Sequence, residues 1–353
     1  QAIIGPNQML DQGGYLFWDT PSTYGFLSHL VIHYMPIANK WLAFYWLNSS
    51  LTFLTCLIFL FTFAYKKNFF VLFLSILLTY NLIFIIGGGN SYLNIALTPS
   101  GGAFRFIWIV VLLFILINLR HLTLIKQFPY IYVTYIFGFL WSIESAFFVS
   151  AALIPYFFHY VFFEKSAIKN FILFLTIPIT ILIIIIYLIL YYYLTIGFFP
   201  DFYMFIGTAT TNVQGFFSNL INDYNSLIIH LIILSVIFLL SFQNKYDYLF
   251  YSIIISLWAI SSYYVGQSSN ITLLKILPYY IFGLFLALKL LEKNILRSHL
   301  TIFFSIILII LCVNFSHPSI LKHFYKTFTN QDYTLSNVKH GLDINTNKLL
   351  KYI

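Results

Sequence analysis

The chain has 353 residues, of which 61% are hydrophobic, 21% aromatic and only 8% charged, and its formal net charge at pH 7 is +8. Soluble domains carry about 25% charged residues, so this composition excludes an ordinary water-soluble protein and indicates one embedded in lipid. Apolar runs that continue without alternation exclude a membrane β-barrel and predict helical spans of about 20 residues. No surface module of basic and aromatic residues supports nucleic-acid binding.

The first 40 residues are more polar than the spans that follow them. The stretch "DTPSTYGFLSHLVIHYMP" (residues 19–36) holds an acid, a Tyr-Gly pair and two histidines. His29 and His33 are four residues apart and therefore share one face of a helix. We expect an amphipathic helix that lies along the membrane surface. The alternative, a metal site made with a carboxylate, lacks a third ligand at a fixed spacing.

Two acids in this segment are candidate general bases. Asp19 is the first candidate, because one carboxylate beside an acceptor hydroxyl or amine can remove its proton. The alternative is that Asp19 caps the following helix, since acid and hydroxyl residues directly before an apolar run are good N-cap residues. Asp11 is the second candidate.

The remaining chain contains about ten apolar segments separated by polar breaks. We expect helical spans at residues 41–64, 69–87, 104–119, 129–145, 146–163, 170–195, 226–242, 248–265, 271–290 and 299–315. Residues 129–163 are too long for one crossing and long enough for two short ones, so a turn is expected near "WSIESAF". The predicted fold class is an all-α, polytopic transmembrane helical bundle. Its domain covers residues 1–315, with an outer first loop at 1–40, and a polar tail follows at 316–353.

Cationic residues predict the orientation of the spans. One set of span ends holds Lys66, Lys67, Arg120, Lys126, Lys165, Lys169, Lys245, Lys293 and Arg297, with Lys289 close by. The opposite loops hold few cations, chiefly Lys40 and Arg105. By the positive-inside rule the first set is cytoplasmic and the second faces outward. The tail is expected to be extracytoplasmic as well.

The polar groups that could perform chemistry gather on the predicted outer face. Arg105 follows the glycine-rich "TPSGGAF", and "YYVGQSSNITLLKILP" contributes Gln267, Asn270 and Lys275. Glu144 is placed near the same face by the turn within 129–163. The span centres are almost purely apolar, which disfavours a channel or a proton-coupled transporter. We therefore expect a site at the outer membrane–water boundary.

An acid inside an apolar block is costly, so Glu144 is a candidate functional residue. The alternative is a packing glutamate that accepts hydrogen bonds from a neighbouring Ser or Tyr. Both interpretations stay open from the sequence.

Several of these segments resemble the GT-C superfamily of polytopic glycosyltransferases. The acid and Tyr-Gly pair of "DTPSTYGFLSHLVIHYMP" are similar to that superfamily's first outer loop, and "GFLWSIESAFFVSAALIPYFF" resembles its paired short helices. "YLTIGFFPDFYMFI" is similar to a later outer loop. More narrowly, "PSGGAFRF", "WSIESAFF" and "SSYYVGQSSNITLLKILP" look like motifs of a poorly characterised bacterial membrane family. The chain departs from that family at Gln267 and Ser269, where the family tends to have Arg and His.

The resemblance implies transfer of a sugar from a polyprenyl-phosphate carrier, by an inverting displacement at the outer face of a bacterial inner or plasma membrane. It implies Asp19 as base and Arg105 with Lys275 as phosphate ligands. Gln267, Asn270, Tyr24 and His29 are further candidate substrate contacts, and Tyr24 belongs to the Tyr-Gly pair. A divalent cation, Mg²⁺ or Mn²⁺, is left open as a cofactor. The superfamily usually has a first helix before the acidic loop, and whether one precedes Gln1 stays open.

The expected partners are membrane lipids, a polyprenyl-phosphate-linked sugar and a glycan or protein acceptor. Two other classes of function remain open at this point. One is a non-catalytic integral membrane subunit, or scaffold, of a larger complex with other membrane subunits. The other is a flippase or transporter of a lipid-linked glycan. An enzyme would bring Asp19, Glu144 and Arg105 together at an outer cavity, whereas a flippase would have a polar groove across the whole bilayer.

Overall fold

The computed structural model describes residues 4–18, 20, 25–64, 69–86, 102–203, 248–266 and 270–290. Every regular element within these ranges is a helix, as predicted, and the strand-like contact among them is an isolated bridge between Leu16 and Thr20. The chain divides into two units, Gln1–Phe304 and Ser305–Ile353. The spans expected at 226–242 and 299–315, and the tail at 316–353, lie outside the described residues.

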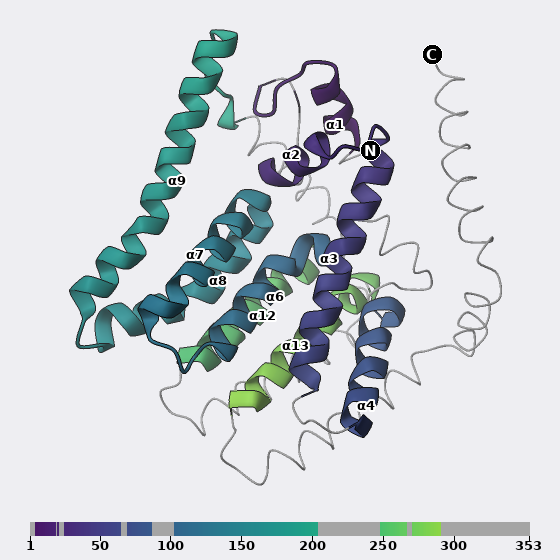
Figure 1. The fold of residues 1–353 in the computed structure, drawn as a ribbon, viewed down its shortest axis with the longest axis vertical. Coiled ribbons are helices and arrows are strands. Elements are labelled where there is room, and N and C mark those ends of the chain that lie inside the picture. The colour runs from purple at the N-terminus through teal and green to yellow at the C-terminus, as the bar shows by residue number, and fades with distance from the viewer. Residues whose placement is uncertain are drawn as a thin grey trace, which may run out of the picture. The chain divides into compact units, whose positions relative to one another are not determined.

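The helices follow the expected spans closely (Figure 1). They are α1 (Ile4–Asp11), α2 (Phe26–Tyr34), α3 (Lys40–Phe63), α4 (Phe69–Tyr80) with the π-helical η1 (Asn81–Ile86), α6 (Ala103–Asn118), α7 (Leu124–Trp141), α8 (Ile143–Phe158) with the π-helical η2 (His159–Phe163), α9 (Ala167–Ile196), α12 (Tyr248–Gly266) and α13 (Asn270–Leu290). Three segments of the described chain are long and apolar enough to cross a membrane: Lys40–Phe63, Ile143–Phe163 and Ala167–Ile196. These segments indicate a helical membrane protein.

The long apolar stretch at 129–163 forms two helices, which confirms the predicted turn. α7 ends at Trp141 and α8 begins at Ile143, and Ser142 between them caps α8 by accepting a hydrogen bond from the Ser145 N–H at 3.0 Å. Such a cap satisfies one of the free N–H groups of a first helical turn. α7 begins at Leu124, earlier than the expected residue 129. Pro129 lies inside α7, past its first turn, and cannot donate a hydrogen bond to the carbonyl oxygen four residues earlier.

The bundle has a proximal end, which contains the α7–α8 turn, and a distal end, which contains the η2–α9 turn. α6 and α8 both begin at the proximal end, where Arg105 and Glu144 form an ion pair. α6 and α13 both end at the distal end, where Lys289 Nζ donates a hydrogen bond to Asn118 Oδ1. By the positive-inside prediction the proximal end faces outward.

Aromatic side chains form much of the core. The Phe59 ring of α3 stacks on Phe282 of α13 with centroids 4.7 Å apart, and Phe106 of α6 lies 4.5 Å from Tyr279. Phe106 also packs on Phe148 of α8 at 5.5 Å. α6 and α13 are consequently the most enclosed helices, whereas α9 stands at the edge with only 11% of its most apolar window buried (Figure 1). An apolar helix exposed in this way is suited to face lipid hydrocarbon.

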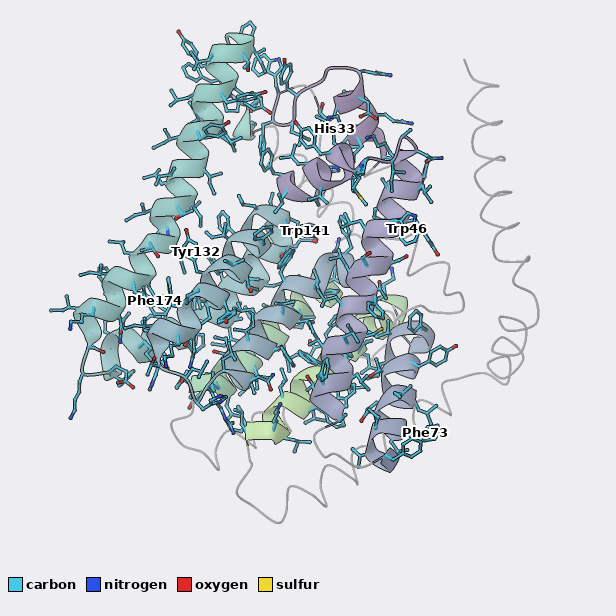
Figure 2. The ribbon with its side chains drawn as sticks, viewed as in Figure 1. His33, Trp46, Phe73, Tyr132, Trp141 and Phe174 are labelled. Carbon is cyan, nitrogen blue, oxygen red and sulfur yellow. The ribbon has the colours of Figure 1, made fainter. Side chains whose placement is uncertain are left out.

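Two short helices cover the proximal end. α1 was not anticipated from the sequence, and α2 is the helix expected after the Tyr-Gly pair. Asn7 of α1 contacts His29 of α2, and Asp11, four residues further along α1, contacts His33. The histidine face of α2 therefore lies against α1. Figure 2 shows His33 beside α1, with Trp141 below the two helices.

Candidate functional site

The site begins with an ion pair between two first turns. Arg105 Nε lies 2.8 Å from Glu144 Oε2; the Arg105 side chain is 8% exposed and that of Glu144 is 39% exposed. The helix N-terminus favours a carboxylate at Glu144, because the free N–H groups carry partial positive charge. The same effect disfavours Arg105 at the start of α6, so Glu144 compensates for an unfavourable placement. Glu144 therefore neutralises a buried cation.

A hydrogen bond next to the ion pair holds α7 against α6. Trp141 Nε1 donates to the Phe104 carbonyl oxygen at 2.7 Å, and both side chains are buried. Phe104 precedes Arg105, and Trp141 stands three residues before Glu144. This hydrogen bond therefore positions the two residues of the ion pair relative to each other.

Two further side chains complete the cluster. The Arg105 guanidinium carbon lies 4.3 Å above the centroid of the Tyr263 ring of α12, a cation–π contact. Lys275 of α13 is half-buried and close enough to Arg105 for their charges to repel. Arg105 pairs with Glu144, and Lys275 adds a second cation near Arg105; burial strengthens the effect of both charges on a ligand. The cluster therefore favours a bound anion with oxygen acceptors, such as a phosphate.

Asp11, the second candidate base, belongs to a different cluster. Its Oδ1 lies 2.9 Å from His33 Nδ1 and 3.4 Å from Lys40 Nζ, and Lys40 also donates to the His33 carbonyl oxygen at 2.8 Å. These contacts join α1, α2 and the start of α3. The structure therefore gives Asp11 a role in holding the two short helices, and it places the Arg105–Glu144 ion pair in a separate cluster.

His29 is buried, whereas the sequence suggested a substrate contact. Its side chain is 0% exposed, and the Asn7 amide nitrogen lies 3.1 Å from its Nδ1. Burial lowers the pKa of His29 to about 4, so the imidazole is neutral at pH 7. A neutral and enclosed imidazole is suited to packing between α1 and α2 rather than to contacting a ligand.

The other predicted site residues lie outside the part of the chain that the structure describes. These are Asp19, Tyr24 and Gln267, together with the side chain of Asn270, whose backbone begins α13. Trp18, next to Asp19, stacks on Phe198 with ring centroids 5.0 Å apart. Gly25, next to Tyr24, lies at the α7–α8 turn, because a β-carbon added there would meet the Trp141 carbonyl oxygen at 2.4 Å.

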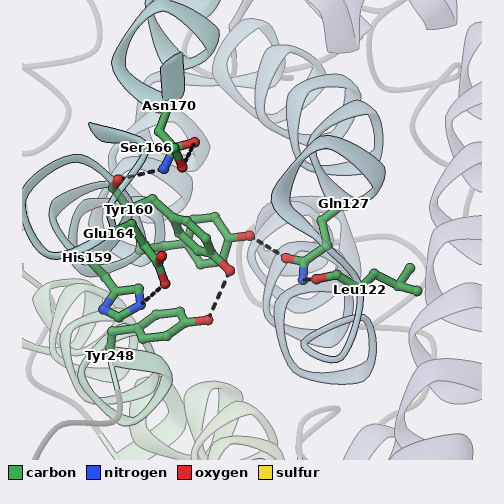
Figure 3. A network of polar contacts seen from close by, with 9 residues as sticks. Leu122, Gln127, His159, Tyr160, Glu164, Ser166, Asn170 and Tyr248 are labelled. Carbon is green, nitrogen blue, oxygen red and sulfur yellow. Dashed lines mark hydrogen bonds and ion pairs between the residues drawn. The ribbon is translucent and has the colours of Figure 1, made fainter. Parts of the chain in front are cut away.

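Sequence reasoning missed a second polar network, at the distal end (Figure 3). Tyr156 donates a hydrogen bond to Gln127 Oε1, and Gln127 Nε2 donates to the Leu119 and Leu122 carbonyl oxygens. Tyr160 reaches the Tyr248 hydroxyl at 3.3 Å. These contacts join α7, α8, η2 and α12. The signal in the sequence was a set of polar residues at the ends of apolar spans.

The start of α9 joins the same network. Asn170 Nδ2 donates to the Tyr160 carbonyl oxygen at 2.8 Å, a carbonyl that the π-helical turn η2 leaves available. His159 Nε2 lies 3.6 Å from Glu164 Oε1, and its ring stacks on Tyr248 with centroids 3.9 Å apart. These polar groups have their partners within the network, so the network holds the helices together.

Metal ligands do not gather in the described residues, where no three His, Cys, Asp or Glu side chains come together. Comparisons with protein-family models, with curated proteins and with solved structures find no match for this chain. Its function is therefore argued from the geometry of the proximal end.

Proposed function

We propose that this chain is a multi-pass membrane glycosyltransferase that moves a sugar from a polyprenyl-phosphate donor to a glycan or protein acceptor. The observation that supports this most directly is the cluster in which Arg105 pairs with Glu144 and Lys275 lies near Arg105. Two neighbouring cations, one of them in a planar guanidinium, are suited to bind the oxygens of a phosphate. The proposed setting is a bacterial inner or plasma membrane, with the proximal end facing outward.

Arg105 and Lys275 hold the phosphate in this proposal. The Arg105 guanidinium presents planar donors that match phosphate oxygens, and the Tyr263 ring beneath it restricts its plane. Lys275 acts as a point charge. Both cations stabilise the negative charge that grows on the phosphate as it leaves the sugar, which is an electrostatic contribution to the rate.

The proposed base is Asp19. Asp11 pairs with His33 and Lys40 in a separate cluster, so Glu144 replaces it as the second candidate. The carboxylate removes the proton of the acceptor hydroxyl or amine, and the acceptor atom forms a bond to the anomeric carbon. The bond from that carbon to the phosphate oxygen breaks, and polyprenyl phosphate leaves with the electron pair. The choice of Asp19 rests on the resemblance of the first outer loop, and Gly25 later in this segment lies against the α7–α8 turn.

The described spans offer little support for a flippase. Thr52, Thr55 and Thr62 of α3 each donate a hydrogen bond to the carbonyl oxygen four residues earlier, at 2.8–2.9 Å. Ser75 of α4 does the same at 2.7 Å. Hydroxyls engaged in this way do not offer a polar path through the bilayer. A scaffold remains the alternative if the cluster binds no donor.

The proposal is tested with purified protein in nanodiscs. Binding of polyprenyl monophosphate is measured first, and release of polyprenyl phosphate from a panel of polyprenyl-phosphate hexoses and pentoses is measured second. We expect Arg105→Gln to weaken binding at least tenfold, whereas Asp19→Asn keeps binding and loses about 10²–10⁴-fold in transfer. Glu164→Gln, at the distal end, is the control and should change neither.

Two results would contradict the proposal. Equal binding of polyprenyl monophosphate by the parent and by Arg105→Gln would show that Arg105 does not bind the phosphate. Equal transfer by the parent and Asp19→Asn removes Asp19 as the base, and the same assay on Glu144→Gln then decides the second candidate. A parent that neither binds nor transfers from any donor favours the scaffold.

A further inference from the structure

An apolar cavity lies between α7, α8 and α9, apart from the candidate site. Its volume is about 350 Å³. It is lined by Tyr135 of α7, by Ser150, Leu153, Ile154 and Phe157 of α8, and by Phe171, Phe174, Leu175, Ile177, Pro178 and Ile181 of α9. Its two polar side chains are already paired, since the Tyr135 and Ser150 hydroxyls hydrogen-bond to each other at 2.8 Å.

The cavity lies at membrane depth. α8 and α9 are both long and apolar enough to cross a membrane, and the lining spans residues 171–181 of α9, about 15 Å along the helix axis. Glu144 faces α6 through Arg105, whereas the lining residues of α8 face α9. The cavity is thus distinct from the phosphate cluster.

α9 contacts the bundle at two separate places and leaves apolar surface between them. Near the cavity, Tyr132 of α7 hydrogen-bonds Thr180 at 2.5 Å, and Phe128 packs on Phe174 (Figure 2). At the proximal end, Tyr192 is buried against the N-terminal segment and donates to the Leu16 carbonyl oxygen. The large apolar side chains between these contacts are mostly exposed, among them residues 182, 183, 186, 187 and 190. Hydrocarbon can therefore reach α9 from the side.

Physical chemistry favours a hydrocarbon occupant. The lining is apolar, and its paired hydroxyls offer water no free partner. The space is open at the side, so an apolar molecule can enter it from the bilayer. Acyl chains are the apolar molecules that a bilayer supplies at the highest concentration. An acyl chain is therefore the occupant that matches both the lining and the depth.

The charges at the distal end indicate the headgroup. Lys126, Lys165 and Lys169 are exposed where α7 and α9 begin, and Glu164 is the acid of the same turn. Phe171, the first lining residue of α9, follows Lys169 by two positions. Basic groups at one membrane surface attract anionic lipids.

We infer that the cavity between α7, α8 and α9 holds one acyl chain of an anionic phospholipid whose headgroup lies among these lysines. The chain fills the space that α9 leaves beside α8. It thereby adds an apolar contact between α9 and the bundle beside the contacts of Phe174 and Thr180. This inference does not depend on the proposed glycosyltransferase activity.

The experiment measures lipids that remain bound to the full chain. Protein in nanodiscs of equal phosphatidylcholine and phosphatidylglycerol is released and examined by native mass spectrometry. Ile181→Trp fills the cavity from α9, and Ile154→Trp fills it from α8. Ile183→Trp is the matched control, because Ile183 is 59% exposed and is not a lining residue.

We expect the parent and Ile183→Trp to retain phosphatidylglycerol in preference to phosphatidylcholine. Both filling variants should retain about tenfold less, which corresponds to about 1.4 kcal/mol of binding free energy. Thermal unfolding of each variant shows whether it is folded, and two variants on different helices guard against one failing to fold. Replacing Lys165 and Lys169 together by glutamine should remove the preference for phosphatidylglycerol.

Either of two results overturns the inference. One is equal phosphatidylglycerol retention by the parent and by both folded filling variants. The other is a parent that retains phosphatidylcholine as well as phosphatidylglycerol, which would remove the anionic headgroup.

Discussion

Arg105 Nε and Glu144 Oε2 lie 2.8 Å apart, so the first turn of α6 is paired with the first turn of α8. The arginine is almost completely enclosed, whereas the glutamate keeps one side open. In the proposed function an anion approaches the pair from this open side, and structural stability and ligand binding are then coupled at the proximal end.

Removing the carboxylate should destabilise the protein. Glu144→Gln leaves the Arg105 cation buried without its ionic partner, and breaking a buried pair costs about 3–5 kcal/mol. Because Glu144 is 39% exposed, solvent screening reduces the expected loss to about 1–2 kcal/mol. Thermal unfolding in nanodiscs measures it.

Glu164→Gln provides the matched control at the distal end. Its partner His159 lies 3.6 Å away, and both side chains are more exposed than Arg105. The expected loss is below about 1 kcal/mol. Equal losses for the two variants would contradict the special role of the Arg105–Glu144 pair.

Tyr263 should stabilise the protein through the face of its ring rather than through its hydroxyl. Tyr263→Leu removes the cation–π contact that the ring makes with Arg105 at 4.3 Å, with an expected loss of about 1 kcal/mol. Tyr263→Phe keeps the ring and should lose less. Chemical denaturation of both variants makes the comparison, and the reverse order of stabilities would contradict the assignment.

Gly25 should tolerate no side chain. It has φ +104°, and an added β-carbon would meet the backbone of Trp141 and Ser142 at 2.4–2.9 Å. Backbone cannot move aside cheaply, so Gly25→Ala should cost about 3 kcal/mol or more. Gly13 has φ +90° but nothing within 4 Å of its β-carbon position, and Gly13→Ala should cost about 1 kcal/mol. Similar unfolding temperatures for the two variants would show that the loop does not touch the α7–α8 turn.

Stability should fall in mild acid because of His29. Burial lowers the pKa of His29 from 6.5 to about 4, so between these values the unfolded chain binds more protons than the folded one. The contribution of His29 to the free energy of unfolding is therefore fully present above about pH 6.5. It is lost as the pH falls to about 4 and does not change further below that, and the whole loss is about 3 kcal/mol. The measurement is the unfolding free energy across this pH range.

The control for this prediction is His29→Gln, which keeps a hydrogen-bonding group opposite Asn7 but does not titrate. Its unfolding free energy should vary less over the same range. Identical pH profiles for the parent and this variant would show that His29 does not carry the dependence.

The helical spans were largely predictable because their cause is local. Hydrocarbon forces the backbone to satisfy its own hydrogen bonds, so apolar length alone indicated α3, α6, α9, α12 and α13 to within a few residues. The turn inside 129–163 was predictable for the same reason. α1 was not, because its eight residues carry no apolar periodicity that distinguishes them from a loop.

Three residues of the candidate site could be predicted from the sequence, but which of them are in contact could not. Charge asymmetry placed Arg105, Glu144 and Lys275 at one end, and the structure brings Arg105 into contact with Glu144 and near Lys275. His29 shows the limit of this reasoning. Its four-residue spacing from His33 described a helix face correctly, but only packing showed that α1 covers that face.

The sequence by itself determined that the chain is a helical membrane protein, where several spans begin and end, and which polar residues share an end of the bundle. Those properties depend on apolar length and charge, which act along the chain. Only the tertiary structure decided which side chains meet: Glu144 with Arg105, Asp11 with His33, and α9 with α7 around an apolar cavity. Such contacts join residues far apart in sequence, and they depend on how each helix is rotated and tilted, which no local pattern specifies.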